Sequence, residues 1–139
     1  ESNYKGKEQT CLVDETIIGV PYGDGDDFES KYGVVFDTVT KQSRPFDIEI
    51  GYGGKYRFKC GIAYKGRAIF LPSGTPGLPI ISVATDGTFH ATKTDNSKLF
   101  GRPIIYKEKL YTLVFNTIDN THSLVTIDEW LRIHEVTKI

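Results

Sequence analysis

A short signature recurs three times along this chain of 139 residues. A valine precedes an aspartate by three positions at the end of an apolar segment, with the aspartates at Asp37, Asp86 and Asp128, intervals of 49 and 42 residues. An earlier apolar segment repeats at the same two intervals, at Val13, Ile62 and Ile104. Repeats of about 20–50 residues are typical of folds whose units bury their apolar faces against one another. The sequence therefore predicts one domain of three related units, at about residues 8–50, 56–92 and 98–136.

Each unit contains four segments with the character of β-strands. The chain has 14 glycines and 12% aromatic residues, a composition typical of strands joined by turns. Short polar stretches separate the first two segments of each unit, at residues 14–16, 65–67 and 107–109, and we interpret them as hairpin turns. The second and third segments are apolar on both faces, whereas the fourth alternates and is expected to be a half-exposed outer strand. We predict an all-β fold of three four-stranded antiparallel meanders.

The C-terminal segment, residues 130–139, leaves two alternatives open. We expect it to contain the fourth strand of the last unit. A short helix is the alternative, because Trp130, Ile133 and Val136 follow one another at intervals of three residues.

Two stretches of the chain resemble kelch-type β-propeller repeats. KLYTLVF followed by SLVTIDEW, and YGVVFDTVTKQSRPFDI, show a hydrophobic strand, a strand ending in Asp, a polar turn and an aromatic residue. Trp130 matches the family's tryptophan, and Phe46 and Phe89 take its place in the other units. The resemblance covers most of residues 11–135 and implies propeller-type blades. Propellers generally close with about 4–8 blades, so three would leave two apolar faces that a second copy or another protein must cover.

A β-trefoil is the alternative architecture. It closes with three four-stranded units in a chain of about this length, and ISVATDGTFHATKTDNSKLF also fits a trefoil hairpin with a turn at Asp86 and Gly87. The corresponding function would be that of a lectin or an inhibitor.

The longer connections are predicted to gather at one end of the units. In a meander, the loops after the second and fourth strands lie at the end opposite to the short hairpins. Functional groups concentrate on loops that a rigid scaffold holds. We therefore predict that this end binds a protein or, alternatively, a carbohydrate, through candidate residues Tyr22, Asp24, Asp26, Asp27, Tyr52, Tyr56, Asn96 and Asn116.

An acidic run near residue 25 raises the question of a metal. Asp24, Asp26 and Glu29 offer oxygen ligands of the kind that calcium prefers, beside flexible glycines. Their spacing differs from that of an EF-hand loop, so we expect a solvated acidic loop, with calcium as the alternative and no other cofactor. The three histidines are isolated in sequence and show no metal-binding spacing.

No catalytic signature stands out. The two cysteines, Cys11 and Cys60, each lie in an apolar strand segment, and we expect buried, unreactive thiols, with a disulfide between them as the alternative. Nucleophile-elbow, phosphate-loop and dinucleotide motifs are absent from the sequence. A non-enzymatic binding module is therefore expected. The alternative is a metal-dependent hydrolase with its site in a propeller channel.

Charge and hydropathy narrow the class of partner. The 17 basic and 18 acidic residues give a net charge of −1, so no basic field is present to hold a nucleic acid. The longest uncharged run, residues 68–85, is interrupted by proline and glycine and does not predict a membrane span. The chain begins without Met or a signal-peptide pattern, which favours a processed or secreted chain but leaves the compartment open.

Overall fold

The computed structural model describes residues 7–22, 32–48, 58–72 and 77–139. In these ranges the chain forms strands and turns without a helix, and thus no helix that could cross a membrane. The first sheet contains β1 (Lys7–Val13), β2 (Thr16–Tyr22), β3 (Tyr32–Asp37) and β4 (Gln42–Asp47), in that order. The middle sheet contains β5 (Phe58–Tyr64), β6 (Arg67–Pro72), β7 (Ile80–Val83) and β8 (Phe89–Thr92). The last sheet contains β10 (Ile104–Tyr106), β11 (Lys109–Asn116), β12 (Thr121–Ile127) and β13 (Ile133–Lys138), and β9 (Lys98–Phe100) also pairs with β11.

The prediction of an all-β chain with three antiparallel sheets is confirmed, but the last sheet has a fifth strand, β9, beyond the four that were predicted. Each sheet begins with a two-residue hairpin, at residues 14–15, 65–66 and 107–108, and these are the three turns that the sequence indicated. The first residue of each turn has a positive φ, 54° at Asp14, 54° at Lys65 and 49° at Lys107. Such turns match the right-handed twist of the strands that they join.

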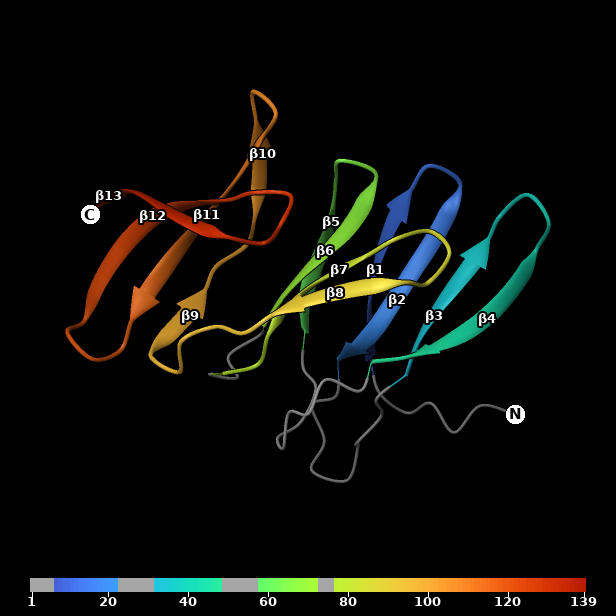
Figure 1. Cartoon of the computed structure of the whole chain (residues 1–139), viewed down its shortest axis with the longest axis horizontal. Helices are drawn as coiled ribbons and strands as arrows, with labels where there is room; N and C mark the ends of the chain where they lie inside the picture. Colours follow the sequence, from blue (N-terminus) through green and yellow to red (C-terminus); the bar gives the residue numbers. More distant parts are fainter. Residues whose placement is uncertain (1–6, 23–31, 49–57, 73–76) are drawn as a thin grey trace.

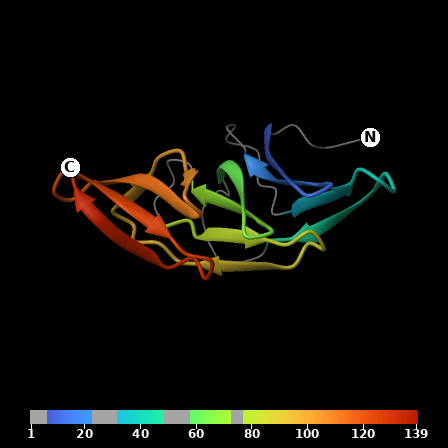
Figure 2. The same ribbon diagram turned by 90° about the horizontal axis from the view of Figure 1, so that it is seen from above.

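The three sheets lie side by side, with the middle sheet between the other two (Figure 1), and Figure 2 shows the same order from above. One apolar cluster fills the space between the first and middle sheets, with Ile18 and Val20 facing Phe70 and Ile81. A second cluster lies between the middle and last sheets and includes Ile69. Neighbouring residues of a strand point to opposite faces, so the continuous apolar run of β6 serves both clusters.

The fourth strand of each sheet is mostly exposed, as the alternating segments predicted. The helix that we considered for the C-terminal segment is wrong, because β13 pairs with β12 along Ile133 to Lys138. A strand there satisfies the backbone groups of β12 that a helix would leave unpaired. A bulge between Leu124 and Val125 offsets the alternation of β13, which explains the misleading spacing of its apolar residues.

The repeated aspartate is structurally equivalent in only part of the chain. In the last sheet, Asp128 N donates to Arg132 O and Leu131 N donates to Asp128 O. Ala84 makes the same two backbone contacts in the middle sheet, with Thr88 and Gly87. Asp86 therefore lies inside the turn, two residues beyond the position that Asp128 occupies. The Val-x-x-Asp signature therefore predicted where these two turns lie, but it aligned Asp86 with Asp128 when the structural equivalent of Asp128 is Ala84.

Cys11 is a free, buried thiol in the first apolar cluster, so no disulfide joins it to Cys60. Burial raises the pKa of the Cys11 thiol to about 11, which keeps it protonated and unreactive at neutral pH. The expectation of a buried, inert thiol is confirmed at Cys11. The side chain of Cys60 lies outside the described part of the structure.

A matched pair of isoleucine substitutions tests the burial of the middle sheet. Ile69 is 1% exposed, whereas Ile118 is 80% exposed in the turn after β11. Ile69→Ala should lower the free energy of unfolding by about 2–5 kcal/mol, because it removes buried methyl groups and leaves a cavity. Ile118→Ala should change it by less than about 0.5 kcal/mol. Urea denaturation measures both, and equal effects would contradict the packing described here.

Candidate functional site

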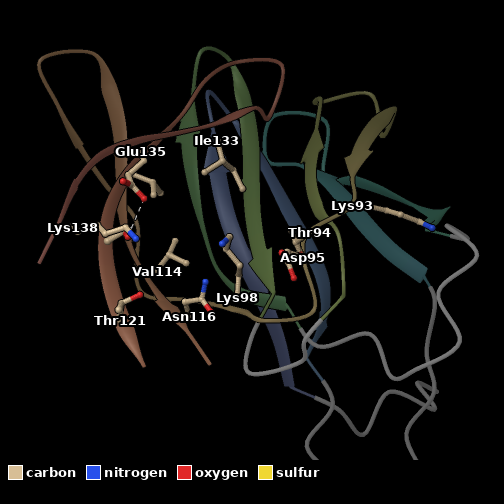
Figure 3. A pocket seen from close by; sticks show the side chains of 12 residues that line it. Lys93, Thr94, Asp95, Lys98, Val114, Asn116, Thr121, Ile133, Glu135 and Lys138 are labelled. Carbon is tan, nitrogen blue, oxygen red and sulfur yellow. Dashed lines mark hydrogen bonds between the residues drawn. The ribbon is translucent and has the colours of Figure 1, made fainter. Parts of the chain in front are cut away.

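A pocket of about 390 Å³ opens between the middle and last sheets, at the end opposite to the hairpins (Figure 3). We call it the loop-end pocket. Its volume lies within the usual range of about 300–1,000 Å³ for ligand sites. It is lined by the β8–β9 connection and the inner face of the last sheet, namely Lys93, Thr94, Asp95, Lys98, Val114, Asn116, Thr121, Ser123, Val125, Ile133, Glu135 and Lys138.

Hydrogen bonds fix the β8–β9 connection against the last sheet. Asp95 Oδ1 accepts bonds from the backbone N and Oγ of Ser97, at 2.9 and 2.8 Å. The carbonyl of Ser97 accepts bonds from the N and Oγ1 of Thr117, at 2.8 and 3.1 Å. Short polar side chains of this kind stabilise turns by bonding to nearby backbone groups. The wall of the pocket is therefore held in place by the turn after β11.

The pocket combines an apolar floor with charged side chains of both signs. Val114, Val125 and Ile133 form the floor. Of the two carboxylates, Asp95 is engaged by Ser97, whose backbone and hydroxyl hydrogen bonds lower its pKa, and Glu135 accepts a bond from Ser123 Oγ at 3.3 Å. Within the described part of the chain, no ion pair involves the pocket's lysines, Lys93, Lys98 and Lys138.

The structure describes the surroundings of two of the predicted binding residues, whose role in binding stays a prediction. Asn116 lines the loop-end pocket, and its Oδ1 accepts a bond from the N of Ile118 at 2.9 Å. Asn96 is exposed in the same connection but does not line the pocket. The remaining candidates lie outside the residues or side chains that the structure describes, and calcium binding stays a prediction there: Tyr22, Asp24, Asp26, Asp27, Glu29, Tyr52 and Tyr56.

The sequence did not point to the lysines or to Glu135. Lys138 and Glu135 lie on β13, and Lys98 begins β9, so they come together only because β9, β11, β12 and β13 pair within the last sheet. Charged residues on outer strands are usually solvated, and nothing in their local pattern distinguishes these three.

A second hollow lies at the other end, between the same two sheets. Two adjoining pockets of about 520 and 190 Å³ share Tyr64, Lys65, Glu129 and Trp130, and we call them together the hairpin-end groove. Trp130 is 66% exposed, with the Arg132 guanidinium 5.1 Å from its ring centre. The loop lengths in the sequence predicted a binding face at the opposite, loop-rich end, so this groove was missed.

Asp128 braces the turn that carries Trp130. Its Oδ1 accepts bonds from the backbone N of Trp130 and of Arg132, both at 2.9 Å. Its Oδ2 lies 3.0 Å from Arg132 Nε and from His134 Nε2. Partial burial alone would raise the pKa of Asp128, but the bonds from His134, Arg132 and Trp130 lower it to about 2. The carboxylate is therefore charged at neutral pH and positions the turn.

Among the residues that the structure describes, no three His, Cys, Asp or Glu side chains lie close enough together to hold a metal ion.

The chain matches no protein-family model and no curated protein sequence. Solved structures do resemble it. Streptogramin B lyase superposes with a TM-score of 0.53 at 10% identity, over 94% of this chain and 54% of that one. The D477G ACO/RPE65 chimera superposes with a TM-score of 0.51 at 13% identity, over 94% of this chain and 35% of that one.

Both of these proteins are β-propellers, so the likeness shows a propeller-like arrangement of the three sheets. It favours the propeller over the trefoil. This chain spans about half of the lyase (54%) and about a third of the chimera (35%).

Acid stability tests the role of Asp128. The folded pKa of about 2 lies below the ordinary value of 3.8, so the carboxylate stabilises the native state above pH 3.8, and this contribution is lost as the pH falls through about 2. Asp128→Asn should therefore lower the free energy of unfolding at neutral pH. The variant should also lose less of this free energy than the wild type as the pH falls from 3.8 to about 2. Chemical denaturation across this range measures the effect. Glu129→Gln, which removes an exposed charge next to it, is the control, and indistinguishable profiles for the two variants would contradict the assignment.

Proposed function

We propose that this chain is a non-enzymatic binding module of propeller type that captures a protein ligand at the loop-end pocket. The observation that carries the proposal is the pair of lysines, Lys98 and Lys138, at an apolar floor whose carboxylates are already engaged by neighbouring hydroxyl and backbone groups, whereas the Lys93 side chain points away from the pocket (Figure 3). Such a pocket favours a ligand with carboxylate groups beside apolar groups. An acidic peptide segment of another protein has this chemistry.

The lining residues favour a peptide over a sugar at this pocket. Lys98 and Lys138 are flexible donors for carboxylates, and Asn116, Thr121 and Ser123 provide neutral hydrogen-bonding groups. Among the described residues that line the pocket none is aromatic, so they offer a sugar ring no stacking surface.

The propeller-type scaffold has a consequence for partners. If the three sheets act as blades, the outward faces of the first and last sheets must be covered by further sheets. The similarity to two β-propellers supports this reading. We accordingly propose that the binding module works as part of a larger assembly of blades.

Charge reversal at the pocket tests the proposed ligand class. A fluorescein-labelled decapeptide of alternating Glu and Leu should bind, and Lys98→Glu with Lys138→Glu should weaken it by about tenfold or more. One hydrogen bond to a charged group contributes about 1.5–3 kcal/mol, and a tenfold change in affinity corresponds to about 1.4 kcal/mol. Fluorescence anisotropy at two salt concentrations measures the binding, which should weaken with salt.

Two controls sharpen this experiment. Lys41→Glu with Arg102→Glu makes the same change in net charge away from the pocket and should leave the affinity unchanged. A decapeptide of alternating Lys and Leu should not bind. The proposal fails if the acidic peptide does not bind the wild-type protein, or if both double variants weaken it equally.

Carbohydrate binding is a second candidate, and the exposed ring of Trp130 in the hairpin-end groove favours it. Trp130 is the sole tryptophan of the chain, so its fluorescence reports on that groove alone. Sugars that stack on the ring would change its emission, whereas a peptide in the loop-end pocket would not. A glycan screen with no change in Trp130 emission would remove this candidate.

A further inference from the structure

The outward faces of the two outer sheets are apolar. On the first sheet, Leu12, Ile17 and Phe36 pair side by side across β1, β2 and β3, and Leu12 is 60% exposed. On the last sheet, Leu113 pairs with Leu124 and is 46% exposed, with Tyr111 two residues before it on the same face. Apolar patches of this kind on a sheet mark an interaction surface.

The hairpins provide a common register for the three sheets. Counting from the first residue after each hairpin, Ile18 and Val20 of the first sheet match Ile69 and Leu71 of the middle sheet. All four are at most 1% exposed, because each pair packs onto the sheet that follows it in the chain. We call this the forward face. Tyr111 and Leu113 occupy the same positions in the last sheet, and within the described residues no further sheet packs on them.

The opposite, backward faces show the same relation. Ala68 of the middle sheet and Leu110 of the last sheet are equivalent, are fully buried, and pack toward the preceding sheet. Ile17 holds this position in the first sheet and is 37% exposed. The forward face of the last sheet and the backward face of the first sheet are therefore the two halves of an interface that the molecule already forms twice.

The hairpin turns add charge complementarity. Tyr64 OH donates to the carbonyl of Glu108 in the next hairpin at 3.3 Å, which places successive hairpins next to one another. Tyr106 occupies the same position before the last hairpin and is 58% exposed. The two hairpins are alike in charge as well: Lys107 Nζ lies 5.4 Å from the centre of the Tyr106 ring, and Lys65 Nζ lies 5.7 Å from the centre of the Tyr64 ring. Continuing the stack would set the lysines of the last sheet beside the first sheet's acidic turn, residues 14–15.

We propose that two copies of this chain associate head to tail. The forward face of each last sheet would pack on the backward face of the other copy's first sheet, so that a twofold axis relates two identical contacts and six sheets form a closed ring. Six lies within the usual range of about 4–8 blades. The three sheets cover 54% of the streptogramin B lyase chain, so a second set of three is close in size to the remaining 46%. This inference rests on the propeller-type scaffold proposed above.

Two single variants and their mixture test the arrangement by light scattering coupled to size exclusion. The wild type should have twice the mass of the 15.6 kDa chain. Leu12→Lys and Leu113→Lys should each give monomers, because each blocks one half of every contact. An equimolar mixture should form a heterodimer, since one of its two contacts has both faces intact. Ile118→Lys, at an exposed turn position, is the control and should remain dimeric.

The other outcomes separate the alternatives. A monomeric wild type, a filament, or dissociation by only one of the two leucine variants would overturn the head-to-tail ring. Circular dichroism confirms that each variant is folded, which is expected because both leucines are exposed. Acidic-peptide binding by a monomeric wild type would overturn the ring and leave the proposed function standing. A wild-type dimer that does not bind the peptide would leave the ring standing and overturn the proposed function.

Discussion

A sheet with two apolar faces must be covered on both, and the rest of this structure depends on that constraint. The middle sheet meets it, because β6 and β7 pack against the first sheet on one side and the last sheet on the other. Burial of apolar surface contributes about 25 cal/mol per Å², so a face left in water forgoes a large stabilisation. The stacking also aligns the hairpins at one end and creates the two hollows between the middle and last sheets. The need to cover the apolar faces of the middle sheet thus accounts both for the stacking of the sheets and for the hollows between them.

Much of the fold could be predicted from short-range patterns. Lys65 and Gly66 indicate a hairpin because glycine adopts a positive φ without strain, and the uninterrupted apolar run of β6 indicates burial on two sides. The register between units was harder. The turn after β7 holds Ala84 where the last sheet has Asp128, and the extra residue of the bulge, Val136 on β13, gives the C-terminal strand a spacing that imitates a helix. Both features are set by pairing with a neighbouring strand, which a single segment does not encode.

The candidate site was predictable in location more than in composition. Assigning each loop to one end of the sheets pointed to the end at which the loop-end pocket lies, and Asn116, one of the predicted residues, lines that pocket. Lys98 and Lys138 were missed because they are 40 residues apart and come together only through the pairing of strands within the last sheet. Trp130 was noted as a family match, but its exposure in a groove follows from the turn that Asp128 holds. Local patterns report which strands form, whereas the side chains of a site converge from several strands.

The central claim is that the outward faces of the outer sheets are packing surfaces covered in solution. The most direct test is thiol labelling of Leu113→Cys in a Cys60→Ser background, with Ile118→Cys as the exposed reference, because buried Cys11 does not react. The account predicts that position 113 labels at least about tenfold more slowly than position 118, since about 1.4 kcal/mol of protection is enough for that ratio. Labelling of the two positions at the same rate would show an uncovered face and contradict it.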